Sequence, residues 1–212
     1  MQISSSREEI LQRIEAAPKR RPVFVDTVST TAVYKPIEPD AMTCFKNELE
    51  TISGQCLLCE NETDLYQQLK LFVLNRSFPA IFCRDSYILQ QLQKFEIPCT
   101  NKTDQFIDMQ AGITGCEFLI ARTGSVLVSS ASESGRQMNV FPPVHIVLAH
   151  VSQLVNYPED ALVALQEKYG DSLPSTVSTI TGPSRTADIE KTLVMGMHGP
   201  KSLIVLISEE PI

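Results

Sequence analysis

The strongest constraint on the fold is a regular alternation of helical and strand patterns that begins near residue 41. The alternation predicts a helix over 41–52, a strand over 55–59, a helix over 62–75, a strand over 79–83, a helix over 86–95 and a short strand near 97–99. The strand runs Gln55–Cys59 and Ala80–Cys83 are almost continuously apolar. Strands buried on both faces are typical of a parallel sheet covered by helices. We therefore predict an α/β domain with a mostly parallel sheet.

The pattern continues after residue 108 with a different rhythm. Two short apolar stretches, Cys116–Ala121 and Ser125–Ser130, are separated by three residues, which predicts a tight strand pair. The remaining predicted elements are a strand over 145–149, a helix from Pro158 to Gly170, a strand over 176–180, a helix over 186–194 and a strand over 202–207.

A short amphipathic helix precedes this domain. A capping box starts at Ser6, and Ile10, Leu11 and Ile14 follow on one face. The proline-containing stretch 18–39 reads as an extended linker. We predict an N-terminal helix and linker over 1–40 and the α/β domain over 41–212. The helix is a candidate contact for an oligomer or a partner, and docking on its own domain is the alternative.

Composition excludes several functional classes. No apolar run approaches the ~18 residues of a membrane span, and the N-terminus lacks a signal-peptide pattern, so we expect a cytoplasmic protein without membrane contact. The net charge of −7 and scattered basic residues argue against nucleic-acid binding. The six cysteines suit reduced thiols, and Cys56 and Cys59 lack the second pair that a zinc or iron–sulfur site needs. We predict no metal and no cofactor.

Four polar segments lie at predicted turns or strand ends, where open α/β sheets bind ligands. In the first, Gly112–Glu117, Thr114 offers a hydroxyl and Glu117 a carboxylate, with a plain turn as the alternative. The third, Pro142–His145, has a rigid backbone and one histidine, a candidate proton shuttle or a structural residue.

The second segment has two parts, at opposite ends of one predicted strand. The candidate ligand-binding residues at the first end are Thr123, Gly124 and Ser125. At the other end, Glu133 and Arg136 place a carboxylate near a guanidinium. The carboxylate could act as an acid, base or nucleophile while the guanidinium binds an anion, or the two could form an ion pair on the surface.

The fourth segment, Thr181–Glu190, is the strongest candidate. A turn at Gly182 and a cap at Ser184 would begin the predicted helix, whose N-terminus favours an anion. A helix cap needs only Ser184, so Arg185 and Asp188 are candidates for binding the ligand, and His198 follows the predicted helix.

Taken in order, these motifs resemble the LUD domain of the lactate utilization proteins. The motifs that carry the resemblance are Gly112-Ile-Thr-Gly115, Thr123-Gly124-Ser125, Pro142-Pro-Val-His145, Thr181–Glu190 and His198-Gly-Pro200. The similarity is greatest to the single-domain type C proteins. This chain departs from the family pattern at Arg122 and in the loop from Glu133 to Arg136.

The resemblance implies a Rossmann-like fold of the sugar-isomerase and CoA-transferase group. It also implies a role in oxidising L-lactate to pyruvate beside iron–sulfur oxidoreductase subunits, with no cluster in this chain. We expect a non-redox subunit that binds a small anion through Arg136, Ser184 and Arg185, with Glu117, Glu133 and His145 as candidates for proton transfer or nucleophilic attack. The alternative is a CoA or acyl transferase that uses Glu133 as its nucleophile.

Overall fold

The structure is a computed structural model that describes residues 6–16, 35–187 and 193–210. The chain divides into two compact units, residues 1–36 and 37–212. In the first unit, α1 (Ser6–Ala16) is the predicted N-terminal helix, and Ile10, Leu11 and Ile14 are exposed on it. The proposed boundary at residue 40 stays a prediction.

A six-stranded sheet forms the centre of the second unit. Its order is β1 (Gln55–Cys59), β12 (Ser202–Ser208), β7 (Val144–His150), β4 (Ala111–Thr114), β2 (Ile81–Cys83) and β3 (Cys99–Thr100). All five pairings between neighbouring strands are parallel. The α/β class and the mostly parallel sheet predicted from the sequence are thereby confirmed.

A second, four-stranded sheet lies against one face of the first. Its order is β8 (Leu154–Val155), β5 (Phe118–Ile120), β6 (Ser125–Ser129) and β9 (Val177–Ile180). β5 and β6 are antiparallel, which confirms the predicted tight strand pair. β9 adds to β6 in the antiparallel sense, and β8 adds to β5 in the parallel sense.

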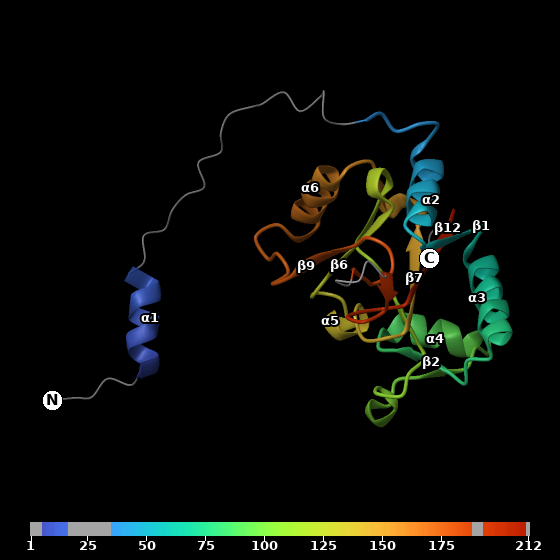
Figure 1. Ribbon diagram of the computed structural model, residues 1–212, viewed down its shortest axis with the longest axis horizontal. Coiled ribbons are helices and arrows are strands. Elements are labelled where there is room, and N and C mark those ends of the chain that lie inside the picture. The colour runs from blue at the N-terminus through green and yellow to red at the C-terminus, as the bar shows by residue number, and fades with distance from the viewer. Residues whose placement is uncertain (1–5, 17–34, 188–192, 211–212) are drawn as a thin grey trace. The chain divides into compact units, whose positions relative to one another are not determined.

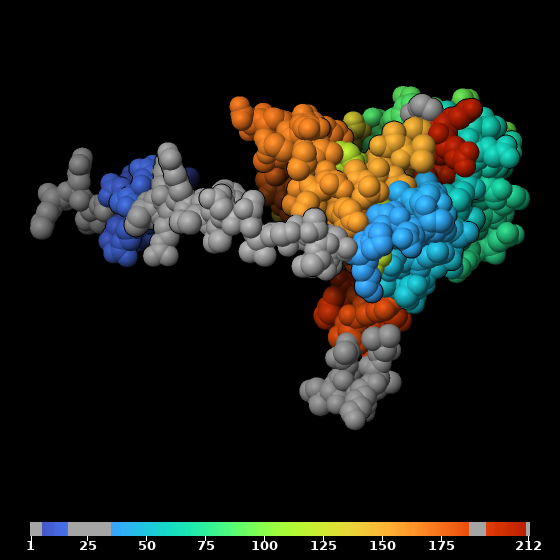
Figure 2. Space-filling model, turned by 90° about the horizontal axis from the view of Figure 1, so that it is seen from above, coloured from blue at the N-terminus to red at the C-terminus, as the bar shows by residue number. Residues whose placement is uncertain are grey.

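The two sheets and their helices are arranged in layers, which can be followed in Figure 1. Helices α3 (Glu62–Arg76) and α4 (Ser86–Lys94) cover the outer face of the large sheet. Its inner face packs against the small sheet and α2 (Ala41–Thr51), which lies in light blue on the surface in Figure 2. Helix α6 (Pro158–Tyr169) covers the far face of the small sheet. The described part of this unit also contains four short helical segments, which are η2 (Thr103–Gln105), η3 (Ala121–Thr123), α5 (Gly135–Met138) and η4 (Val151–Gln153).

The predicted helix over 186–194 is wrong. Its described residues form an antiparallel hairpin of β10 (Arg185–Ala187) and β11 (Leu193–Met195). The β-branched residues Thr186 and Val194 lie opposite each other, a pairing that favours strands. Backbone bonds from Ser184 N–H to the Pro200 carbonyl and from Gly196 N–H to the Ser184 carbonyl close the base of the hairpin.

The first polar segment begins inside a strand, β4 (Ala111–Thr114), which was not among the predicted elements. Gly112 lies in β4, between β7 and β2. A β-carbon at this position would lie 2.5 Å from Pro142 Cγ and 2.8 Å from Met138 Cε. The glycine is therefore explained by close packing of the following loop.

The two cysteines of β1 belong to different layers of the core. Cys56 and Cys59 belong to different core clusters, because they lie on opposite faces of β1. Both thiols are free, and the described residues contain no group of three or more potential ligands that could hold a metal ion. Within the described part of the chain, no helix has the length and apolar character needed to cross a membrane.

Candidate functional site

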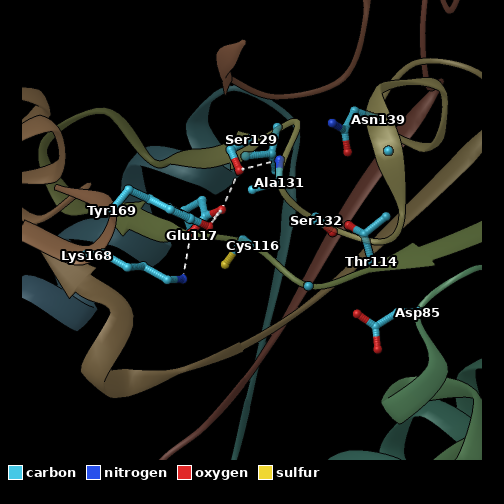
Figure 3. A pocket seen from close by; sticks show the side chains of 13 residues that line it. Asp85, Thr114, Cys116, Glu117, Ser129, Ala131, Ser132, Asn139, Lys168 and Tyr169 are labelled. Carbon is cyan, nitrogen blue, oxygen red and sulfur yellow. Dashed lines mark hydrogen bonds and ion pairs between the residues drawn. The ribbon is translucent and has the colours of Figure 1, made fainter. Parts of the chain in front are cut away.

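A cavity of about 190 Å³ lies where the chain passes from the large sheet to the small one. It is bordered by the end of β4, the start of α4, the loop after β6 and the C-terminal end of α6. The residues that line it are Asp85, Thr114, Gly115, Cys116, Glu117, Val128, Ser129, Ala131, Ser132, Gly135, Asn139, Lys168 and Tyr169 (Figure 3). This is the carboxyl edge of β2 and β4, where ligands of open α/β sheets bind.

Glu117 accepts more hydrogen bonds than Asp85, the other acidic residue that lines the cavity. Its carboxylate accepts hydrogen bonds from Ser129 Oγ at 2.5 Å, Lys168 Nζ at 2.7 Å and Tyr169 Oη at 2.9 Å (Figure 3). Burial opposes ionisation of Glu117, which is only 6% exposed, but these three donors outweigh it and hold its pKa below the usual value. Glu117 is thus an ionised, oriented carboxylate at neutral pH.

The backbone that presents Glu117 is also fixed. Gln153 donates its side-chain N–H to the carbonyls of Cys116 and Glu117, at 2.7 and 3.3 Å. Glu117 N–H donates to the carbonyl of Leu127, in line with the β5–β6 ladder. The carboxylate is therefore held by strand pairing on one side and by an amide clamp on the other.

Thr114 and His145 form a second polar pair, behind the cavity wall. Thr114 lines the cavity, and its Oγ1 lies 2.9 Å from His145 Nε2. His145 is completely buried, and burial lowers its pKa to about 4, so the ring is neutral at pH 7. Because His145 is not among the lining residues, its contact with the cavity runs through the Thr114 hydroxyl.

Glu133 lies beside the cavity, because Ser132 and Gly135, on either side of it in the sequence, are lining residues. Its Oε2 accepts hydrogen bonds from Ser86 N–H and Ser86 Oγ, both at 2.8 Å, at the N-terminus of α4. These bonds lower the pKa of Glu133. The carboxylate thus accepts a free N–H group at the N-terminus of that helix and has a structural role as its cap. Arg136 is exposed, and its guanidinium donates to Thr176 Oγ1 at 3.4 Å.

Three of the predicted ligand-binding residues lie at the opposite end of β6. β6 has five residues, so Ser125 and Ser129 are separated by roughly 13 Å. Ser125 Oγ lies 2.9 Å from Thr181 Oγ1. Gly124 has φ of +56°, and a β-carbon there would lie 2.2 Å from the backbone nitrogen of Leu49 in α2. At Thr123 and Gly124 the chain therefore turns tightly against α2.

The fourth segment lies on the same side as this turn. Arg185 donates from its guanidinium to the carbonyl of Ile52 and to Ser53 Oγ, directly after α2. A cation at the C-terminal end of a helix interacts favourably with the helix dipole. Gly182, with φ of +77°, packs its α-carbon against Ile52. These contacts explain Gly182 and Arg185 without a ligand.

The remaining residues of that segment are dispersed. Ser184 cannot cap a helix here, because a strand follows it, and His198 is exposed. The described strands of this hairpin, in orange-red, lie at the lower edge of the unit in Figure 2. Asp188 lies outside the described residues. The structure thus brings Thr114 and Glu117 to one cavity, with Glu133, Arg136 and His145 near it, and leaves the other candidates elsewhere.

Sequence reasoning missed several residues of this cavity. Lys168 and Tyr169 belong to the last turn of α6, 51 and 52 positions after Glu117. Their pattern in the sequence is that of an ordinary helix end before Gly170. Asp85 looks like a helix cap and is one, since it accepts a hydrogen bond from Ile88 N–H. No local signal distinguishes these three residues from structural ones.

The cavity combines acceptor, donor and cation at short range. Lys168 uses one of its three N–H donors for Glu117, and its side chain is 52% exposed. Asn139 and Ser132 add polar side chains on the opposite wall (Figure 3). A small ligand with a carboxylate and a hydroxyl or carbonyl group matches this set of partners.

The fold and the cavity define an α/β protein with a parallel sheet whose polar site lies at the carboxyl edge of that sheet. The sequence profile of the LUD domain matches residues 5–208, so the chain belongs to the LUD domain family. The resemblance inferred from the motifs is thereby confirmed.

Several known proteins are similar to this chain. Lactate utilization protein C of Bacillus subtilis is 36% identical over 201 residues, which cover 83% of each chain. An uncharacterized protein of Neisseria meningitidis is 38% identical over 107 residues, 50% of this chain. This match covers 46% of the Neisseria protein, and a further match covers 42% of lactate utilization protein C of Bacillus licheniformis. The chain therefore spans less than half the length of these two relatives.

A solved structure is similar in fold. The crystal structure of a DUF162 family protein from Deinococcus radiodurans superimposes with a TM-score of 0.59, over 79% of this chain and 96% of that one. At 16% sequence identity this similarity concerns the fold alone.

Proposed function

We propose that this protein is a non-redox component of a lactate utilization system and that its cavity binds a small carboxylate ligand. The observation that carries the proposal is the Glu117–Lys168 pair, which places an ionised carboxylate and a half-exposed ammonium group at the wall of the cavity. Relatives of similar length that are named lactate utilization protein C support the biological role.

The ligand would be held by complementary charges and hydrogen bonds. The free donors of Lys168 are placed to bind a carboxylate, and the Asn139 amide and the Thr114 hydroxyl to bind an adjacent oxygen. Glu117 is the acceptor for a ligand hydroxyl and the candidate base. This assignment moves the anion site from the predicted helix N-terminus at Ser184 to the end of β4.

The proposed system needs an electron acceptor in another chain. The resemblance implies iron–sulfur oxidoreductase subunits as the partners that would carry it. Those partners belong to the proposal.

Titration calorimetry with L-lactate and with pyruvate tests the ligand. Lys168→Met removes the ammonium group and keeps the aliphatic stem, so we expect it to abolish measurable binding. The matched control is Lys70→Met, because Lys70 also pairs with a glutamate, Glu96 at 3.2 Å, but lies on α3 and does not line the cavity. Equal binding by wild type and Lys168→Met would refute the assignment of the cavity.

The CoA transferase alternative stays a prediction. Glu133 is the nucleophile that it requires, and in this structure the Glu133 carboxylate is bonded to Ser86 at the end of α4. No contact of Glu133 favours nucleophilic attack over this capping role.

A further inference from the structure

A second hollow adjoins the cavity and differs from it in chemistry. It has a volume of about 240 Å³ and is lined by Asp85, Tyr87, Ile88, Gly115, Cys116, Leu148 and Gln153. Three of these residues, Asp85, Gly115 and Cys116, also line the first cavity. The two spaces therefore meet along the start of α4 and the end of β4. In Figure 3, Cys116 lies between the Glu117 group and Asp85.

Most polar groups of the second hollow are already engaged. The Gln153 amide donates to two backbone carbonyls, and its oxygen accepts from His150 N–H at 2.8 Å. Asp85 Oδ1 accepts from Ile88 N–H, and Tyr87 Oη donates to Glu62 at 2.9 Å. Apart from the second carboxylate oxygen of Asp85 and the Cys116 thiol, which belong to the edge shared with the first cavity, the hollow offers the Tyr87 ring and the hydrocarbon of Ile88 and Leu148. The hollow thus suits an apolar or aromatic group.

Gly115 keeps the junction of the two spaces open. Apart from its chain neighbours, no described heavy atom lies within 4 Å of the position that a β-carbon would take at residue 115. The backbone of Gly115 has no positive φ, so the fold itself does not demand glycine there. A small side chain at this position would therefore enter the shared space.

We infer that the site takes an acid with two parts, a compact polar head and an apolar or aromatic extension. This inference rests on the proposed function, since the carboxylate end binds in the cavity of Lys168 and Glu117. The extension crosses Gly115 and packs on Tyr87, Ile88 and Leu148. Lactate would occupy the first cavity alone, so a longer 2-hydroxy acid fits the whole site.

The test compares L-lactate with L-phenyllactate by titration calorimetry. Burial of roughly 60 Å² of the phenyl ring gives an expected affinity gain of about tenfold for phenyllactate. Tyr87→Ala removes the ring that the extension contacts, and we expect it to cancel most of this gain without changing lactate binding. Gly115→Val fills the junction, and we expect it to abolish the gain while thermal unfolding stays that of the wild type.

Each outcome decides between the two proposals. If lactate binds and phenyllactate binds no more tightly, the two-part site is refuted and the proposed function stands. If the gain persists in both Tyr87→Ala and Gly115→Val, the extension does not lie in the second hollow. Phenyllactate binding that Lys168→Met leaves intact refutes the placement of the head. Absence of binding by both acids refutes both proposals.

Discussion

The Glu117–Lys168 pair makes a quantitative prediction for Lys168→Met. The substitution leaves the nearly buried Glu117 carboxylate with Ser129 and Tyr169 as its donors. A hydrogen bond to a charged group contributes about 1.5–3 kcal/mol. Because the Lys168 side chain is 52% exposed, solvent screening lowers this value. We expect Lys168→Met to reduce the free energy of unfolding by about 1–2 kcal/mol at pH 7.

The loss should depend on pH with a defined sign. The pKa of Glu117 is lower in the folded state than in the unfolded state, so its stabilisation is complete above the unfolded pKa. The stabilisation is lost as the pH falls through the folded pKa. In Lys168→Met, burial still opposes ionisation and the ammonium group is gone, so the pKa of Glu117 rises. The difference in stability between the two proteins should therefore shrink from pH 7 towards pH 3.

Urea unfolding followed by circular dichroism measures this difference. A double-mutant cycle with Glu117→Gln isolates the pair, because Lys168→Met should cost little when Glu117 is already neutral. The matched control Lys70→Met breaks an ion pair whose glutamate is 86% exposed, and it should cost less than about 0.5 kcal/mol. An equal cost of Lys168→Met in both backgrounds, or a cost that does not fall with acid, would refute the reasoning.

Three further predictions concern the fold and the buried groups. Gly124→Ala should destabilise the protein by about 3 kcal/mol in urea unfolding, because the left-handed backbone and the contact with α2 both resist a β-carbon. The control variant Gly115→Ala should have a free energy of unfolding within about 0.5 kcal/mol of the wild type. The pKa of His145 is about 4 in the folded state and 6.5 in the unfolded chain, so protonation of His145 lowers the free energy of unfolding by about 3 kcal/mol as the pH falls from 7 to 4. His145→Gln should remove this part of the pH dependence. If the free energy of unfolding of the variant fell with pH as steeply as that of the wild type, the assignment would be contradicted. The Cys56 and Cys83 thiols, whose pKa values burial raises to about 12, should resist alkylation at pH 8 until urea unfolds the chain, and mass spectrometry of labelled peptides measures this.

Much of the fold could be predicted because its elements are encoded locally. The apolar runs at β1 and β2 are buried between layers, so their composition reports the parallel sheet directly. The short strand β4 was missed, because its glycine and threonine are typical of a turn and only the packing of Pro142 explains Gly112. The segment after Arg185 was predicted as a helix from its local capping pattern, but its described residues form strands, because pairing between β10 and β11 overrides that pattern.

The site was less predictable than the fold. Thr114 and Glu117 could be found because they stand in a glycine-flanked segment at a strand end. Lys168 and Tyr169 could not, because their relation to Glu117 exists only once α6 covers the small sheet. Arg185 illustrates the opposite error: an arginine beyond the needs of one helix cap serves the C-terminal end of another helix, α2.

The clamp formed by Gln153 has a mechanical consequence. The chain crosses from the large sheet to the small sheet between β4 and β5, and again between β7 and β8. Gln153 ties these two crossings together, because it lies in the second and binds the carbonyls of Cys116 and Glu117 in the first. A rotation of one sheet against the other would have to stretch both of these hydrogen bonds. The tie therefore resists any displacement of the backbone that carries the Glu117 carboxylate.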